Sequence, residues 1–66
     1  MNYPPEVTVL GNSITHIEGI NDITFSKGST EDRYIEKAYF ANGEEIPQEI
    51  LNNLDSDYIY ELEVNN

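Results

Sequence analysis

The segment Asp57-Tyr-Ile-Tyr-Glu-Leu-Glu-Val64 decides which fold the sequence predicts, because it shows the best alternation in the chain. Successive side chains of a β-strand point to opposite faces, so this pattern is typical of a half-buried strand. One face carries Tyr58, Tyr60, Leu62 and Val64, and the other carries Asp57, Ile59, Glu61 and Glu63. We therefore expect a strand over residues 57–64, with its tyrosine face in the core or in a dimer interface.

A short helix is expected immediately before this strand, over residues 47–54. Pro47 suits the first turn of a helix, because its fixed φ is helical and its missing N–H has no partner there. Ile50, Leu51 and Leu54 form an apolar stripe along such a helix. Asp55-Ser56 then ends it and leads into the strand.

Residues 31–41 fit two structures. A helix has good capping residues at its start, whereas the aromatic and β-branched residues at the centre of the segment favour a strand. We favour the strand. Asn42-Gly43 follows, and this dipeptide is a strong signal for a two-residue hairpin turn, although it can also end a helix. Residues 44–46 would then form a return strand.

The first part of the chain predicts three further strands, over residues 6–10, 14–18 and 23–26. The isoleucines at 14, 17 and 20 do not alternate strictly, and Gly19 is a candidate for a β-bulge that resets the register. The predicted fold class is therefore α+β: a small antiparallel β-sheet of four or five strands with one short helix near the C-terminus. Residues 1–66 form a single domain, in which we expect residues 1–5 to be mobile.

Charge excludes several classes of function. The chain has 13 Asp and Glu against 3 Lys and Arg, a formal net charge of −10. Binding to nucleic acid through phosphate neutralisation needs clustered Lys and Arg, and so does binding to anionic lipid. The first residues lack the features of a signal peptide, and no apolar run is long enough to span a bilayer. The absence of cysteine excludes disulfides and Cys-ligated zinc. We expect a cytoplasmic protein.

The composition supports a folded but marginal domain. Leu, Ile, Val and Phe account for 17 of 66 residues, above the share of about 20% below which disorder is the usual outcome. A chain of this size buries only about 60% of its unfolded surface, and its like charges repel one another in the compact state. Self-association would add burial, so we expect a homodimer.

The acidic residues concentrate at the C-terminal end. Residues 44–66 contain no Lys or Arg and seven acidic residues, namely Glu44, Glu45, Glu49, Asp55, Asp57, Glu61 and Glu63. On a strand over 57–64, alternate carboxylates are about 6.6–6.8 Å apart, close to twice the ~3.4 Å repeat of phosphates along one DNA strand. We expect these seven residues to bind a basic partner surface, together with Tyr39 as an aromatic contact.

In size, acidity, lack of cysteine and expected α+β build, the chain resembles the acidic inhibitors encoded by bacteriophages. The resemblance is one of composition and carries no shared motif. Those proteins imitate nucleic acid to block restriction enzymes, CRISPR effectors, repair enzymes or nucleoid proteins. The resemblance implies a phage-type, anti-defence protein acting in the cytoplasm of the host cell.

Catalytic and metal sites are weakly indicated. His16, the single histidine, has Ser13 and Glu18 nearby in sequence, but one histidine on a strand is more often a surface or contact residue. Asp55, Asp57 and Glu61 offer oxygen ligands at a spacing that lacks the glycine and the further ligands of a calcium loop. We expect no enzyme activity, no cofactor and no metal site.

The leading hypothesis is therefore a non-enzymatic DNA mimic that occupies the basic nucleic-acid-binding cleft of a host or defence protein. Such a protein binds another protein and binds neither nucleic acid nor membrane directly. The alternative is a small structural or assembly module whose acidity serves solubility only, and which pairs through an exposed strand edge or an apolar face.

Overall fold

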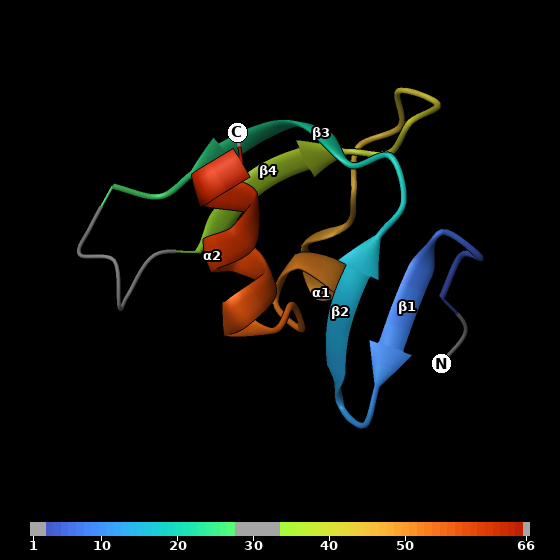
Figure 1. Cartoon of the computed structure of the whole chain (residues 1–66). Coiled ribbons are helices and arrows are strands. Elements are labelled where there is room, and N and C mark those ends of the chain that lie inside the picture. The colour runs from blue at the N-terminus through green and yellow to red at the C-terminus, as the bar shows by residue number, and fades with distance from the viewer. Residues whose placement is uncertain (1–2, 28–33, 66) are drawn as a thin grey trace.

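The computed structural model describes residues 3–27 and 34–65 and confirms the α+β class (Figure 1). The strands form two separate two-stranded antiparallel sheets, so the prediction of one sheet of four or five strands is wrong. In chain order the elements are β1 (Val7–Leu10), β2 (Ser13–Ile17), β3 (Asn21–Phe25), β4 (Ile35–Tyr39), α1 (Gln48–Leu51) and α2 (Ser56–Asn65).

The first sheet is the hairpin β1–β2, close to the strands expected from the sequence. Gly11 has a φ of 64° and occupies the first position of the two-residue turn, where a positive φ favours glycine. The register pairs Thr8 with His16 but Val9 with Ile14, so Thr15 is left without a partner. This β-bulge explains the irregular isoleucine spacing, and it lies at Thr15 instead of at Gly19.

The second edge of β2 is closed by the segment between the helices and by one side chain of α2. Ile14 N–H donates to Asn53 C=O at 2.8 Å, and Asp55 N–H donates to Ile14 C=O at 2.8 Å. Further along, Ile17 N–H donates to the Tyr58 hydroxyl at 2.9 Å, and that hydroxyl donates to Ile17 C=O at 3.3 Å. With this edge occupied, β2 has no free side on which the second hairpin can pair.

The second sheet is β3–β4, and β4 confirms that the strand was the correct choice within residues 31–41; residues 31–33 lie outside the described residues. A turn is present at the expected place, but it has three residues, 41–43, and not the expected two. Gly43 N–H donates to Phe40 C=O at 2.9 Å, and Phe40 N–H donates to Glu44 C=O at 2.8 Å. The expected return strand over 44–46 is reduced to a single bridge between Tyr39 and Glu45. This bridge occupies the free edge of β4 and helps to keep the two sheets apart.

The prediction of a strand over residues 57–64 is wrong, because these residues lie in the ten-residue helix α2. Residues 3–27 and 34–65 therefore contain two helices, and α1 is shorter than the predicted 47–54. Tyr58 is buried, and Ile59 and Leu62 pack partly against the core, which is the spacing of one helix face. Tyr60 and Val64 are exposed, so the predicted common face of four apolar residues does not exist.

A single apolar core joins both sheets and both helices. Four isoleucines from β2, β4 and the segment before α1 are its most deeply buried large side chains, namely Ile14, Ile17, Ile35 and Ile46. The other buried apolar residues are Ala38, Phe40, Ile50, Leu51, Leu54 and Tyr58. In the part of the chain that the structure describes, no helix is long and apolar enough to cross a membrane.

Candidate functional site: an acidic groove

The structure divides the predicted binding residues into two groups. Glu44, Glu45 and Glu49 line one concave surface beside the first turn of α1. The other four acidic residues, Asp55, Asp57, Glu61 and Glu63, lie at the start of α2 or along it. The acidic C-terminal region is therefore two surfaces and not one continuous row.

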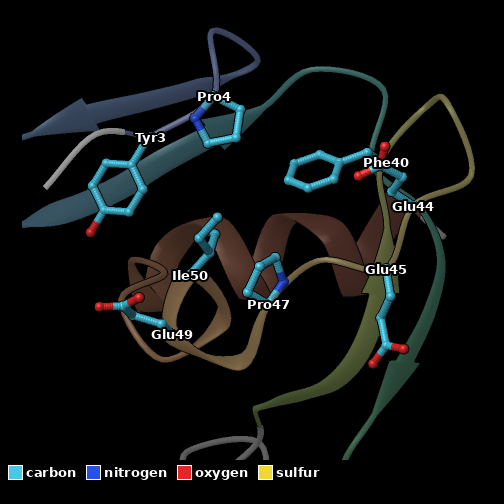
Figure 2. A pocket seen from close by; sticks show the side chains of 8 residues that line it. All are labelled: Tyr3, Pro4, Phe40, Glu44, Glu45, Pro47, Glu49 and Ile50. Carbon is cyan, nitrogen blue, oxygen red and sulfur yellow. The ribbon is translucent and has the colours of Figure 1, made fainter.

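The first group surrounds a hollow of about 290 Å³ that we call the acidic groove (Figure 2). Figure 2 shows the side chains of Pro4, Phe40, Pro47 and Ile50 toward its middle, with the glutamate carboxylates around them. The groove is lined by Tyr3, Pro4, Phe40, Glu44, Glu45, Pro47, Glu49 and Ile50. No lysine or arginine is among these lining residues.

Two hydrogen bonds with Asn42 fix the position of Glu44 beside Phe40. The Asn42 side-chain carbonyl accepts from Glu44 N–H at 2.9 Å, as is common for asparagine in turns. The Asn42 amide also donates to Glu44 Oε1 at 3.4 Å. Because Phe40 N–H donates to Glu44 C=O, the Asn-Gly turn places an acidic side chain beside a mostly buried aromatic ring.

A second hollow of about 210 Å³ adjoins the acidic groove and shares Pro4, Phe40 and Glu44 with it. It brings in a further acidic residue, Glu6, from the segment that leads into β1. An apolar, partly aromatic floor with carboxylates at its rim suits a cation that also has a flat or aliphatic part. Arginine and lysine side chains have both features.

Tyr39 does not line the acidic groove. It lies half-buried at the end of β4, where its backbone pairs with that of Glu45. The aromatic lining residues are Tyr3 and Phe40 instead. The sequence offers little signal for this floor, because Tyr3 and Pro4 are more than thirty residues from every other lining residue.

The α2 acids have mixed roles. Asp55 accepts a hydrogen bond from Asp57 N–H at 3.1 Å, and Ile59 N–H donates to Asp55 C=O at 3.0 Å, so Asp55 is the N-cap of the helix. Asp57 lies in the first turn, where a negative charge is favourable. Glu61 is exposed, whereas Glu63 is partly buried.

The helix also removes the proposed row of carboxylates at strand spacing. Asp57 and Glu61 are four residues apart and share a helix face, with an axial rise of about 6 Å between them. Glu63 lies on another side of α2. The pair Asp57 and Glu61 keeps a spacing near twice the ~3.4 Å phosphate repeat, but the row of three carboxylates is lost.

Replacing Asp55 with alanine is expected to destabilise the protein by about 1 kcal/mol, because the substitution removes the N-cap hydrogen bond of α2. Asp55→Asn keeps a cap acceptor while removing the charge, and it should stay within about 0.5 kcal/mol of the parent protein. Urea denaturation followed by circular dichroism measures both. Equal stability of the alanine variant and the parent protein would show that the cap contributes nothing.

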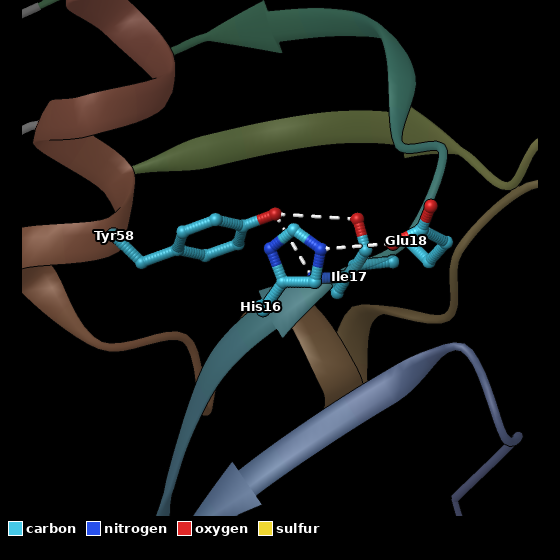
Figure 3. Close-up of polar contacts among 4 residues, drawn as sticks. All are labelled: His16, Ile17, Glu18 and Tyr58. Carbon is cyan, nitrogen blue, oxygen red and sulfur yellow. Dashed lines mark hydrogen bonds and ion pairs between the residues drawn. The ribbon is translucent and has the colours of Figure 1, made fainter.

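His16 is exposed on β2, and the side chains of Glu18 and Tyr58 lie beside it. Its Nε2 lies 3.2 Å from Glu18 Oε2, and its ring is tilted against that of Tyr58 with centroids 5.8 Å apart (Figure 3). Burial raises the pKa of Tyr58, and the negative charges of Glu61 and Glu18 raise it further. Within residues 3–27 and 34–65, no group of three His, Asp or Glu side chains is arranged to hold a metal ion.

The candidate site is therefore a groove that the fold assembles from the N-terminal segment and residues 40–50. Comparison with protein-family models, with curated proteins and with solved structures found no match to this chain.

Proposed function

We propose that this protein is a small non-enzymatic binding protein that inhibits a nucleic-acid-handling protein by occupying its basic cleft. The observation that carries the proposal is the acidic groove, in which Glu44, Glu45 and Glu49 surround an apolar floor. The formal net charge of −10 supports a basic partner, because surfaces of opposite charge attract. On a phage-encoded protein, this activity would act against host or defence proteins in the cytoplasm.

The groove is matched to an arginine or lysine of the partner. The glutamates would pair with the charged end of that side chain, as phosphates do in the cleft's normal ligand. Phe40, Pro47 and Ile50 would contact its aliphatic stem. Recognition of this kind requires no reaction, which fits a non-enzymatic role.

The exposed face of α2 supplies a second contact surface of the same sign. Asp57 and Glu61 lie on it, and Tyr60 between them is exposed. Two carboxylates about 6 Å apart along the helix with a tyrosine alongside suit a further arginine-rich region of the partner. The groove and this face together would cover an extended basic cleft.

The proposal is tested by capture and competition. The tagged full-length protein is used to capture proteins from a bacterial lysate, which are then eluted with increasing salt. We expect a captured protein that binds DNA, that loses its DNA when the acidic protein is added, and whose Kd for the acidic protein rises with salt. A Kd that stays constant from low to high salt, or a captured protein that keeps its DNA, would contradict the proposal.

Variants then separate the groove from overall charge. Neutralising Glu44, Glu45 and Glu49 to glutamine should weaken binding by about 3 kcal/mol, roughly 100-fold in Kd, at about 1 kcal/mol per exposed carboxylate. The matched control neutralises three exposed acids outside the groove, Glu18→Gln, Asp22→Asn and Glu36→Gln. Both triple variants remove three negative charges. Equal losses of affinity in the two variants would therefore show that net charge alone, and not the groove, determines binding.

The α2 face is tested by neutralising Asp57 and Glu61 together, since Glu63 lies on another side of the helix. We expect a further loss of affinity, because the face lies outside the groove and its contribution adds to that of the groove. If neither this variant nor the groove variant changes the affinity, the acidity serves solubility only. The binding role then gives way to the alternative of a structural or assembly module.

A further inference from the structure

The hairpin β1–β2 is the one long stretch of this acidic chain without formal charge. Residues 7–17 contain no Asp, Glu, Lys or Arg, although the chain holds 13 acidic residues. Two large apolar side chains on β1 are exposed, Val9 at 42% and Leu10 at 75%. The hairpin lies at one side of the molecule, with β1 outermost (Figure 1).

The outer edge of β1 has backbone groups directed away from its own hairpin. Val7 and Val9 lie opposite Ile17 and Ile14, whose N–H and C=O groups bond away from β1 to Tyr58, Asn53 and Asp55. In an antiparallel pair, two residues that face each other point their N–H and C=O groups either both toward the partner strand or both away from it. The groups of Ile17 and Ile14 point away from β1, so the N–H and C=O groups of Val7 and Val9 point away from β2. Val7 N–H donates to Pro4 C=O at 3.0 Å. No other described strand pairs with this edge.

β1 also lacks the usual protection of an edge strand. Native edges commonly carry a charge or a proline that prevents pairing with another chain, and Val7–Leu10 contains neither. β2, by contrast, has its second edge closed by Tyr58 and the segment 53–55. Among the described strands, β1 and β3 each have an edge that pairs with no other strand. β3 carries the charged Asp22, whereas β1 is uncharged, and of its outward backbone groups the Val7 N–H is already bonded.

We infer that a second copy of this chain pairs with the outer edge of β1 in an antiparallel, two-fold arrangement. With Thr8 at the two-fold axis, each Val9 N–H would donate to the Val7 C=O of the other copy. The result is a four-stranded sheet with the two β1 strands at its centre. Val9 and Leu10 of both copies lie along the new contact, which reduces their exposure to water.

The distribution of charge favours this face for contact between two copies of the chain. Two chains of net charge −10 repel each other through most faces, and the charge-free hairpins are where they can approach. Antiparallel pairing places Glu6 of one copy near Leu10 of the other, whereas parallel pairing would place the two Glu6 side chains together. A self-complementary interface of this two-fold type is the commonest in homo-oligomers.

The inference does not rest on the proposed function, and salt separates the two. Screening weakens the attraction of the acidic groove for a basic partner, but it also weakens the repulsion between two copies. Self-association through β1 should therefore become stronger as salt rises. Because the paired edge is only four residues long, the dimer should be weak and its formation dependent on protein concentration.

Sedimentation velocity of the full chain, at several concentrations and at low and high salt, tests the inference. Val9→Pro removes only an N–H that points outward, and proline is tolerated at such an edge position. Leu10→Glu places a negative charge at a well-exposed position that faces Glu6 of the other copy in the antiparallel pairing, where like charges repel. The control is Val64→Glu, which adds the same charge at an exposed apolar residue of α2.

We expect reversible dimerisation of the parent protein and of Val64→Glu, with at least a tenfold higher dissociation constant for Val9→Pro and Leu10→Glu. Circular dichroism checks that each variant is folded, and Leu10→Glu keeps the test valid if the proline variant is not. A parent protein that stays monomeric at all concentrations overturns the inference. Dimerisation of folded Leu10→Glu at the parent's strength, or loss of the dimer in Val64→Glu, also overturns it.

Discussion

Replacement of Tyr58 with phenylalanine should lower the free energy of unfolding by about 2–4 kcal/mol, a large share of the 5–15 kcal/mol typical of a small domain. The hydroxyl is the partner of both Ile17 N–H and Ile17 C=O, at 2.9 Å and 3.3 Å (Figure 3). Ile17 is 1% exposed, so water cannot replace either bond without opening the core. The phenyl ring remains in place, so the loss reports the hydrogen bonds and not a cavity.

Tyr60→Phe is the matched control, because it deletes the same hydroxyl from a side chain that is 58% exposed. It should change stability by no more than about 0.5 kcal/mol. Urea denaturation of both variants at neutral pH makes the comparison. If the two substitutions cost the same, the closure of the β2 edge by Tyr58 contributes nothing to stability.

Tyr58 should also make the stability of the protein fall at alkaline pH. Burial raises the pKa of Tyr58 in the folded state, with smaller contributions from Glu61 and Glu18, while the hydrogen bond with Ile17 lowers it. The unfolded chain therefore loses this proton at a lower pH than the folded one. Stability is fully present below about pH 10, the ordinary tyrosine value, and is lost as pH rises through the folded pKa. Tyr58→Phe should lose less stability over this range, and equal slopes would contradict the assignment.

Replacement of Gly19 with alanine should lower the free energy of unfolding by about 3 kcal/mol, which is the second large effect that we expect. Gly19 has a φ of 76°, which disfavours any side chain by about 1–2 kcal/mol. A Cβ added there would also lie 2.7 Å from the Cβ of Ala41, and overpacking of this kind typically costs a further 1–3 kcal/mol. Asn21 reinforces this contact, because its side chain donates to Gly19 C=O at 2.9 Å and to Phe40 C=O at 3.2 Å.

Two further variants separate backbone strain from steric clash. Gly43 has a comparable φ of 92°, but a Cβ added there would have open space around it. Gly43→Ala should therefore lose only the stability that the positive φ costs. Ala41→Gly, combined with Gly19→Ala, removes the clashing methyl group and should recover part of the loss, with a coupling energy of about 0.5–3 kcal/mol. Thermal unfolding of the four proteins measures the cycle. Additive effects of the two substitutions would show that the turn does not press on Ala41.

The strands β1 to β4 were the most predictable part of the fold, because their signals are local, whereas the strands predicted over 44–46 and 57–64 do not form. The turn at Gly11 and the turn at Asn42-Gly43 each depend on backbone conformations that few residues favour. β4 followed from the β-branched and aromatic residues at its centre. The separation into two sheets was not predictable in this way, since it depends on what occupies the free edges of β2 and β4.

The helix α2 was wrongly predicted although the sequence contained a signal for it. Asp55 before Tyr58, Ile59 and Leu62 is an N-cap followed by a helical apolar face, and the alternation of residues 57–64 competed with it. Both periods can be read from the same eight residues. The helix prevails in the fold because it buries Tyr58 against β2 and presents the hydroxyl to Ile17.

The candidate site was only partly predictable for a related reason. Glu44, Glu45 and Glu49 were identified because they are close in sequence and uncompensated by any base. The floor of the groove was missed because Tyr3 and Pro4 meet Phe40 and Ile50 only in the folded chain.

By itself, the sequence determined the α+β class, the approximate positions of β1 to β4, and a formal net charge of −10. These properties depend on composition and on interactions between residues close in the chain. The tertiary structure decided that residues 56–65 form a helix, that the acids divide between a groove and a helix face, and that β1 keeps an open edge. The physical reason is that burial and edge pairing involve residues distant in sequence, and local preference does not specify which of them meet.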